Sequence, residues 1–591
     1  MNYKLNTSDA SQKREPLLKA LARLVPLMKG EGSRVMFAMA AILLTATIQL
    51  SSPYIIMHVV DTYITVGDYA GIVTWSVILL AINIVAFFSS YLQTRTMGGV
   101  GRRILFNLRN LIFNRLQELP VAFFNQNRSG DLISRINNDT DKLNQFFAHA
   151  LMQFLSNFFL ILGAGIAMLS LDPMLGFLAL VPAIVVLIIT QLISPWVKRK
   201  NFASLQTMGG LSGEIAESLA NFKVIVAFNR LDYFCEKFAA ANKANFSASV
   251  RAGIASNFFL PLFGIAYNLG QLIVLGYGIT MIAEGALTTG LLIGFLLYVT
   301  NFYNPLRQLA TVWSSLQLAL AGLDRISEVL ALNTNMLVVP SPQTVPSPQT
   351  PAHAVLEFRD VAFQYPESKP ILNHVSLVLE RGKTYALIGP TGGGKTTTAS
   401  LMARLYDPTK GTVLLDGKDI RAYEPEERAK KIGFILQEPF LFTGTMRDNI
   451  LYGNAEFGVY TDEQLTQLIN DAGLATLFSR FDQGLDTKVA SSGDSISLGQ
   501  KQLIAFMRAA LRKPELLILD EATANIDTVT EQLLEDILAK LPAGTTKVII
   551  AHRLNTIKGA DEIFFVNAGV ITRAGSMESA VDMLLHHRMQ S

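Results

Sequence analysis

The chain has 591 residues, of which 50% are hydrophobic and only 16% are charged, and its mean hydropathy is +0.33. A single core rarely extends beyond about 250–300 residues, so at least two domains are expected. Soluble proteins carry about 25% charged residues, so the shortfall argues against a wholly soluble or disordered chain and favours a membrane protein. The near balance of 50 basic and 47 acidic residues argues against a dedicated nucleic-acid binder, and we expect no nucleic-acid partner.

The first half of the chain contains uncharged runs long enough to cross a bilayer, which requires about 20 apolar residues per helix. Only Asp172-Pro173 separates the third run from the fourth, and only Glu284 separates the fifth from the sixth. The turn chemistry of Asp-Pro favours a break there. We therefore predict an all-α transmembrane domain of six helices within residues 35–332. The runs are Val35–Val60, Ala70–Thr94, Leu143–Leu171, Met174–Val197, Ala252–Ala283 and Gly285–Leu306.

Basic residues mark the loops that are expected to face the cytoplasm. The loops Arg95–Lys142 and Lys198–Arg251 each contain eight Lys or Arg residues, whereas the short connections contain none. Because cytoplasmic loops hold the basic excess, both termini and both long loops are expected inside the cell. Residues 1–34 are predicted to form a cytoplasmic segment in which Pro16–Lys29 is an amphipathic elbow helix on the membrane surface. The apolar pattern of both loops predicts helices that project into the cytosol.

A linker rich in Pro, Ser, Gln and Thr is predicted at residues 333–354, where the hexapeptide Val339–Thr344 is repeated directly. From residue 355 to 591, strand-like and helix-like segments alternate, and a helix is expected at Lys395–Tyr406. This alternation predicts an α/β nucleotide-binding domain. The clearest strand-like segments are Val355–Phe363, Thr384–Ile388, Leu516–Leu519 and Lys547–Ala551.

A glycine-rich loop between a predicted strand and a predicted helix is the sharpest chemical signal. The run Gly389-Pro-Thr-Gly-Gly-Gly-Lys395-Thr396 matches the P-loop pattern G-x-x-x-x-G-K-[ST]. Glycines let backbone amides surround phosphate oxygens, Lys395 neutralises the β and γ oxygens, and the Thr396 hydroxyl is a ligand for Mg²⁺. The sequence therefore predicts ATP and Mg²⁺ as cofactors. The expected nucleotide contacts in this region are Gly389, Thr391, Gly392, Gly393, Gly394, Lys395, Thr396 and Thr397.

Two acidic residues follow the apolar run Leu516–Leu519. A buried parallel strand would deliver Asp520 and Glu521 to its carboxyl edge, where such sheets bind ligands. Asp520 is expected to join the Mg²⁺ shell, and Glu521 is expected to act as the general base on the attacking water.

Together, these residues resemble the ATP-binding cassette (ABC) family over nearly the whole chain. The run Ser495–Gln502 is similar to the family signature loop. The resemblance implies that Ser497, Gly499 and Gln500 cap ATP bound to the opposite subunit, so that two cassettes must meet head to tail.

The resemblance assigns four further positions. Tyr365 would stack on adenine, Gln437 would sense Mg²⁺ and water, Asp527 would communicate across the dimer, and His552 would stabilise the γ-phosphate with Glu521. A buried strand tyrosine is the alternative for Tyr365.

The membrane half resembles the exporter type of the family. Segments 123–132 and 224–229 are similar to regions at or near its coupling helices, which would dock on the cassette around Gln437. The third signature position, usually Gly, is Leu498 here. Because heterodimeric exporters often carry such a change in the chain that keeps its catalytic glutamate, a second, different half-transporter is the favoured partner, with a homodimer as the alternative.

We therefore expect an ABC-type transport ATPase that exports amphipathic or hydrophobic compounds, such as drugs, lipids or peptide-like molecules, by alternating access. No carboxylate or ammonium group lies within the spans, which weakens an ion-coupled mechanism. An importer, for example of a metal chelate, and an ATP-gated channel or sensor are the alternatives. The expected location is a bacterial cell (inner) membrane, with the cassette in the cytoplasm and the spans in the lipid bilayer.

Overall fold

The structure is a computed structural model, and it describes residues 3–5, 25–332, 353–366, 368–437, 439–479, 481, 483–489, 496–520, 532, 534–535, 537–539, 541–551, 559–575 and 577–588. The chain divides into two compact units. The cassette unit contains residues 1–6, 115–129 and 331–591, and the membrane unit contains residues 7–114 and 130–330. The repeated hexapeptide and most of the predicted elbow helix lie outside the described residues. Of that elbow, Val25–Met28 forms a 3₁₀ helix.

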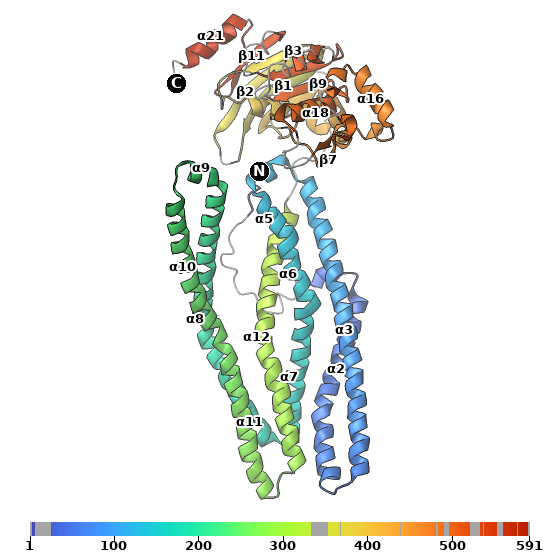
Figure 1. Cartoon of the computed structure of the whole chain (residues 1–591), viewed down its shortest axis with the longest axis vertical. Helices are drawn as coiled ribbons and strands as arrows, with labels where there is room; N and C mark the ends of the chain where they lie inside the picture. The colour runs from blue at the N-terminus through green and yellow to red at the C-terminus, as the bar shows by residue number, and fades with distance from the viewer. Residues whose placement is uncertain are drawn as a thin grey trace. The chain divides into compact units, whose positions relative to one another are not determined.

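Long helices build the membrane unit (Figure 1). Within the part of the chain that the structure describes, five helical stretches are long and apolar enough to cross a membrane: Gly32–Ile64, Tyr69–Glu118, Ser129–Leu171, Pro173–Ala220 and Leu231–Ala283. The sixth predicted span begins α12, where Asn301 and Asn304 dilute the apolar run. The helices are α2 (Gly32–Val59), α3 (Tyr69–Glu118), α4 (Val121–Gln126), α5 (Ser129–Ser134), α6 (Thr140–Gln145), α7 (Leu151–Leu171), α8 (Pro173–Ala220), α9 (Phe222–Ala227), α10 (Leu231–Asn257), α11 (Phe259–Ala283) and α12 (Thr289–Ala331).

The narrow separations predicted between neighbouring spans are confirmed. Asp172 ends α7 and caps α8, because its Oδ1 accepts a hydrogen bond from Leu175 N at 2.8 Å while Pro173 occupies the first turn. Helix α11 ends at Ala283, and Gly285 adopts a φ of +74° in the turn before α12.

Two helices are longer than a membrane crossing requires, as the predicted projections need. Helices α3 and α8 contain 50 and 48 residues. At 1.5 Å per residue each is more than 70 Å long, which is well over twice the thickness of the hydrocarbon core, about 30 Å. The short helices α4 and α9 overlap the two segments that resemble coupling helices, and each begins two residues before its segment.

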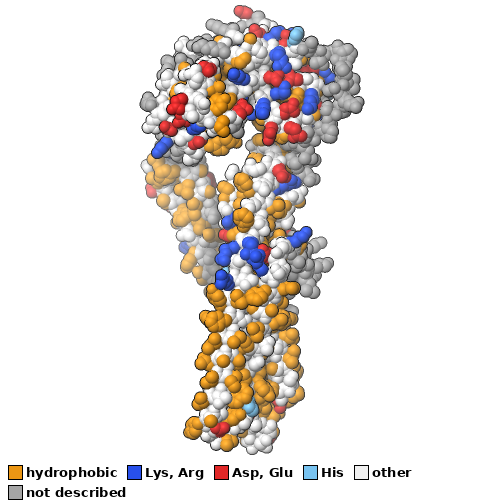
Figure 2. All heavy atoms as spheres, turned by 90° about the vertical axis from the view of Figure 1, so that its right-hand side faces the viewer, with side chains coloured by type: hydrophobic (Ala, Val, Ile, Leu, Met, Phe, Trp, Pro, Cys, Tyr) orange, Lys and Arg blue, Asp and Glu red, His pale blue; other side chains and the backbone are white. Residues whose placement is uncertain are grey.

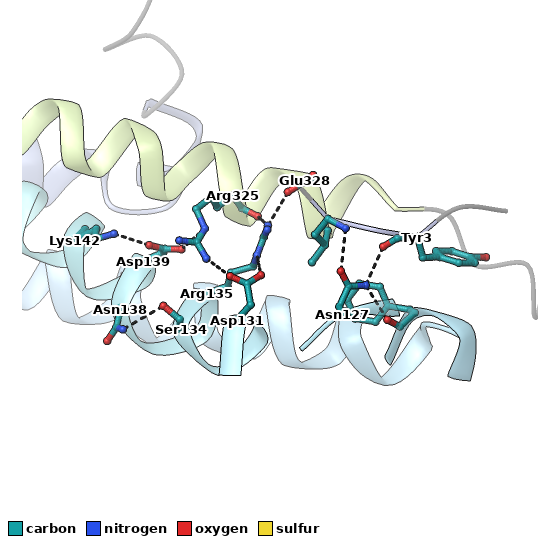
Figure 3. Close-up of polar contacts among 12 residues, drawn as sticks. Tyr3, Asn127, Asp131, Ser134, Arg135, Asn138, Asp139, Lys142, Arg325 and Glu328 are labelled. Atoms are coloured by element: carbon teal, nitrogen blue, oxygen red, sulfur yellow. Dashed lines mark hydrogen bonds and ion pairs between the residues drawn. The ribbon is translucent and has the colours of Figure 1, made fainter. Parts of the chain in front are cut away.

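An ion-pair cluster joins α12 to the helices that precede α7 (Figure 3). The side chain of Arg135 is only 1% exposed, and its guanidinium donates to Asp131 Oδ2 at 2.9 Å and to Glu328 Oε2 at 2.8 Å. Arg325, on α12, contacts Asp131 and lies 3.2 Å from Asp139 Oδ2. Segment Arg135–Asp139 is a π-helical turn, a distortion that often marks functional sites.

The cassette unit is α/β, as predicted. A four-stranded antiparallel sheet has the order β2-β1-β4-β5, and a six-stranded sheet has the order β12-β11-β3-β10-β9-β6, in which β11, β3, β10, β9 and β6 are parallel. The strands are β1 (Ala354–Gln364), β2 (Pro370–Glu380), β3 (Thr384–Ile388), β4 (Lys410–Leu415), β5 (Lys418–Asp419), β6 (Ile432–Ile435), β7 (Gly444–Thr445), β8 (Lys488–Val489), β9 (Leu516–Asp520), β10 (Thr546–Ile550), β11 (Glu562–Asn567) and β12 (Val570–Arg573). The helices are α13 (Lys395–Met402), α14 (Pro425–Lys431), α15 (Met446–Leu451), α16 (Asp462–Asp471), α17 (Ala475–Phe478), α18 (Leu498–Ala510) and α21 (Met577–Arg588).

Strand β9 is buried on both faces. Leu516 and Ile518 belong to the core shared by both large sheets and α13, whereas Leu517 and Leu519 belong to the core under α15, α16 and α18. Successive side chains of a strand point to opposite faces, so one aliphatic run supplies two cores and holds Asp520 at its end.

The helix predicted at Lys395–Tyr406 is shorter than expected. It ends at Met402, and Arg404 adopts a left-handed φ of +51°. The buried Arg404 guanidinium donates to Asp407 Oδ1 at 3.1 Å and to two backbone carbonyls, so the chain turns back before Tyr406. A left-handed residue ends an α-helix, and helical periodicity does not reveal this position.

Candidate nucleotide-binding site

Three predicted site segments lie at one edge of the six-stranded sheet. The P-loop follows β3, Asp520 ends β9, and Gln437 comes two residues after β6. Strand β10 pairs in parallel with both β3 and β9, and β6 pairs in parallel with β9. Parallel register brings the carboxyl ends of these strands to the same edge, which is where such sheets bind ligands.

Glycine is required at two P-loop positions by backbone shape. Gly389 has a φ of +143°, and a Cβ there would lie 2.0 Å from the carbonyl oxygen of Val566. Gly394 has a φ of +112° at the residue before α13. Only glycine adopts such dihedrals without strain, so the loop can curl over the first turn of the helix and aim its amides inward.

Lys395 is held inside the loop. Its side chain is 6% exposed, and its Nζ donates to the backbone oxygens of Gly389 at 2.9 Å and Pro390 at 3.1 Å. These carbonyls place a positive charge at the start of α13, where the helix dipole also favours anions. The local arrangement suits a phosphate group.

A hydroxyl and a carboxylate meet beside this lysine. Thr396 Oγ1 donates to Asp520 Oδ1 at 3.3 Å, and Asp520 is 4% exposed. Among the described residues no group of three or more His, Cys, Asp and Glu side chains could hold a metal by itself. The pair nevertheless fits Mg²⁺, which usually takes one or two protein oxygens and completes its shell with water and substrate phosphates.

Tyr365 belongs to an aromatic cluster. Its ring meets Phe363 edge-on at 4.9 Å and Tyr406 edge-on at 5.1 Å, and its hydroxyl lies 3.3 Å from Thr397 Oγ1 at the start of α13. The ring therefore stands half-buried beside the P-loop helix.

Sequence reasoning missed Tyr406. Its hydroxyl accepts a hydrogen bond of 2.6 Å from Asn125 Nδ2 in α4, and burial raises its pKa. Docking of the first coupling segment around Gln437 stays a prediction, and the hydrogen bond from Asn125 identifies Tyr406 as one contact of α4. The turn Tyr406-Asp-Pro408 was the available sequence signal, but nothing local identifies its partner.

The first described residues of the chain lie along α4 in the same unit. Asn127 Nδ2 donates to Tyr3 O at 2.9 Å, and Asn127 Oδ1 accepts from Leu5 N at 2.9 Å (Figure 3). Both Tyr3 and Leu5 are less than 5% exposed. No feature of the sequence predicted this contact.

The predicted signature residues lie at the beginning of α18. Ser497 Oγ accepts from Gln500 N at 3.2 Å, and Gln500 Oε1 accepts from Ser497 N at 3.1 Å, which is a capping box. Gly499 lies in the first turn, and Leu498 is 37% exposed beside it. Glu521, Asp527 and His552 lie outside the described residues.

Two family profiles cover most of the chain. The profile for the ABC transporter transmembrane region matches residues 35–306, and a second profile, for the ABC transporter, matches residues 372–524.

Full-length relatives agree with these profiles. An uncharacterized ABC transporter ATP-binding protein of Bacillus subtilis is 34% identical, over 93% of this chain and 89% of the relative. A fatty acid ABC transporter ATP-binding/permease protein of Mycobacterium bovis is 31% identical, over 86% of this chain and 79% of the relative. A multidrug resistance ABC transporter ATP-binding and permease protein of Lactococcus lactis is 29% identical, over 95% of this chain and 94% of the relative. The importer alternative is not favoured by these relatives. The chain therefore belongs to the ABC transporter family, as an exporter-type half-transporter that joins one multi-pass membrane domain to one transport ATPase domain.

Proposed function

We propose that this half-transporter exports amphipathic or hydrophobic compounds and is driven by Mg²⁺-dependent ATP hydrolysis between two cassettes. This proposal rests on one observation: Lys395, Thr396 and Asp520 lie together at the carboxyl edge of the parallel sheet. The substrate class is supported by spans without carboxylate or ammonium groups and by relatives named for multidrug resistance and fatty acids.

The nucleotide site divides the chemistry among a few side chains. Lys395 would neutralise the β and γ phosphate oxygens, and Thr396 and Asp520 would hold Mg²⁺. Bound Mg²⁺ would reduce the negative charge on those oxygens. Glu521 would accept a proton from the attacking water, and His552 would stabilise charge on the γ-phosphate.

Residues around the nucleotide would set its orientation. Tyr365 offers an aromatic face to adenine, and Gln437, at the edge that carries Asp520, would orient water near the metal. The remaining proposed nucleotide contacts are Gly389, Thr391, Gly392, Gly393, Gly394 and Thr397 in this chain, and Ser497, Gly499, Gln500 and Asp527 across the dimer interface.

Dimerisation follows from the half-transporter architecture, and we favour a different second chain. Leu498 places an exposed aliphatic side chain at the start of α18, where the partner's nucleotide would be capped. That change would weaken one of the two sites while Glu521 stays catalytic in the other. We also propose that the spans lie in the inner membrane of a bacterial cell and that the cassette faces the cytoplasm. The bacterial relatives support the first part, and the excess of Lys and Arg in the two long loops supports the second.

Conservative replacement of Glu521 tests the catalytic assignment. In the assembled dimer, Glu521→Gln should bind Mg-ATP within threefold of wild type but hydrolyse it about 10²–10⁴-fold more slowly, because a general base contributes that much. Glu426→Gln is the matched control, since Glu426 is exposed on α14, and it should keep full activity. Retention of most activity by Glu521→Gln would contradict the role.

Two further measurements test the partner and the substrate. The chain purified alone should show little ATPase activity, and co-expression with a second half-transporter should restore it; a fully active dimer of this chain alone would remove the heterodimer proposal. In proteoliposomes, hydrophobic cationic dyes and fatty acids should stimulate ATP hydrolysis, whereas sugars and amino acids should not. Stimulation by polar solutes alone would overturn the proposed substrate class.

A further inference from the structure

A basic pocket of about 350 Å³ lies on the membrane unit where the beginning of α2 meets α3. Arg34, Arg95 and Arg103 are its charged lining. Arg34 is the last charged residue before the uncharged run of α2, and Arg95 is the first after that of α3. Figure 2 shows the Lys and Arg side chains gathered where the apolar band of the membrane unit ends.

The pocket retains an excess of positive charge after internal pairing. Glu31 accepts from Arg103 Nε at 2.6 Å and from Arg34 Nη1 at 2.8 Å. The hydrogen bond from Arg103, aided by Arg34, lowers the pKa of Glu31 to about 2, so this carboxylate is ionised at neutral pH. Arg95 is exposed and has no acidic partner among the described residues. Three guanidinium groups therefore face one carboxylate.

The rest of the lining is suited to an amphiphile. Ser33 and Thr96 contribute hydroxyl groups, whereas Phe37 and Leu92 contribute apolar surface. Phe37 is 49% exposed and Leu92 is 39% exposed, and both lie on the side of the pocket that continues into the uncharged runs. A ligand in this pocket would meet basic and hydroxyl groups at one end and hydrocarbon at the other.

Gly99 keeps the pocket open beside Arg103. It lies inside α3 with no positive φ, so its backbone does not require glycine, and glycine lowers helix stability. A Cβ built at this position would lie 3.4 Å from Arg103 Nη1. The missing side chain leaves space next to a guanidinium, and a larger residue would fill it without removing any charge.

We propose that this pocket binds the phosphate headgroup of one anionic phospholipid of the cytoplasmic leaflet. Arg34 and Arg95 contact the phosphate, while Phe37 and Leu92 pack against the glycerol and the first acyl carbons. The leaflet assignment rests on the proposed orientation of the basic loops. Basic pockets between transmembrane helices at this level suit anionic headgroups, and arginine suits phosphate because it can donate two parallel hydrogen bonds. The apolar wall distinguishes a lipid from free phosphate, which would gain nothing from it.

Native mass spectrometry of the detergent-purified full chain, titrated with phosphatidylglycerol or phosphatidylcholine, tests the proposal. One phosphatidylglycerol per chain should bind in preference to phosphatidylcholine, and inorganic phosphate at millimolar concentration should not displace it. Arg34→Gln with Arg95→Gln should weaken this binding about 25-fold, or about fivefold per arginine, because one basic residue near anionic lipid contributes about 1 kcal/mol. Gly99→Leu should weaken it at least tenfold with all charges retained.

Arg102→Gln is the matched control, because Arg102 is an exposed arginine of α3 that does not line the pocket. It should change phosphatidylglycerol binding less than twofold. Gel filtration and the thermal midpoint establish that each variant is folded, and Gly99→Leu tests the site independently of charge. The proposal would be overturned if Arg102→Gln weakened phosphatidylglycerol binding as much as the pocket variants do. It would also be overturned if binding were unchanged in both pocket variants, or if inorganic phosphate displaced the lipid. The readout does not depend on ATP hydrolysis, so it is separate from the proposed transport activity.

Discussion

Replacing Arg135 with glutamine is expected to destabilise the membrane unit by about 3 kcal/mol. Removing one partner of a buried ion pair costs about 3–5 kcal/mol, because the remaining charge loses its compensation. Arg135 is 1% exposed, but Asp131 and Glu328 are 27% and 25% exposed, so water will compensate them in part and the lower end applies. Arg325 also stays close to Asp131.

Replacing Glu328 with glutamine should cost less. The amide oxygen of glutamine can still accept from Arg135 Nη1, so only the charge assistance is lost, which is about 1 kcal/mol. Because the two residues share one contact of 2.8 Å, the double variant should be more stable than the sum of the single effects predicts, by about 1–2 kcal/mol.

Thermal unfolding of the detergent-purified chain, followed by gel filtration after heating, measures these differences. At an unfolding entropy of about 2.1 cal/mol/K per residue, one kcal/mol shifts the midpoint of a unit of about 300 residues by about 1.5 °C, so Arg135→Gln should lower it by about 5 °C. Arg109→Gln is the control. The Arg109 guanidinium lies 3.4 Å from Asp141 Oδ1, and the two side chains are 38% and 51% exposed. Exposed ion pairs contribute less than about 1 kcal/mol to stability. Equal midpoints for the two arginine variants, or additive effects in the double variant, would refute the reasoning.

Three further outcomes concern the nucleotide site and its connection to α4. Tyr365→Ala should weaken binding of a fluorescent ATP analogue by about 5–150-fold, since stacking of a base contributes about 1–3 kcal/mol, whereas Tyr365→Phe should change it less than threefold. Asp520→Asn should abolish Mg²⁺-dependent hydrolysis while nucleotide binding in EDTA stays within threefold of wild type, because only the metal ligand is lost. Tyr406→Phe should increase hydrogen exchange of the amides in residues 121–126 about fivefold, because one hydrogen bond from Asn125 contributes about 1 kcal/mol, and Asn125→Ala should do the same.

Each of these three predictions would be contradicted by a specific result. Equal affinities for Tyr365→Ala and Tyr365→Phe would assign the tyrosine a packing role only. Normal Mg²⁺-dependent turnover by Asp520→Asn would exclude it from the metal shell. Unchanged exchange in α4 after both substitutions would show that the Tyr406 contact does not stabilise that helix.

Local sequence patterns were sufficient for the spans, for the loop between β3 and α13, and for the position of Asp520 at the end of β9. Uncharged runs of about 20 residues and glycines at fixed spacing report on burial and backbone shape within one segment. The break at Asp172-Pro173 was predicted for the same reason, because a cap and a proline act on their own helix. The helix predicted up to Tyr406 was too long because its end depends on Arg404, whose guanidinium binds carbonyls of a distant turn.

The sequence by itself determined that this chain spans a membrane and carries a phosphate-binding loop, since both properties depend on neighbouring residues. Only the tertiary structure decided which distant groups meet: Arg135 with Glu328, Tyr406 with Asn125, and Arg34 with Arg95. The two residues of each pair are far apart in the sequence, and the packing of helices and strands brings them together. The periodicity of the sequence does not predict these contacts, because the sequence does not distinguish a polar side chain that is solvated from one that is paired with a distant residue.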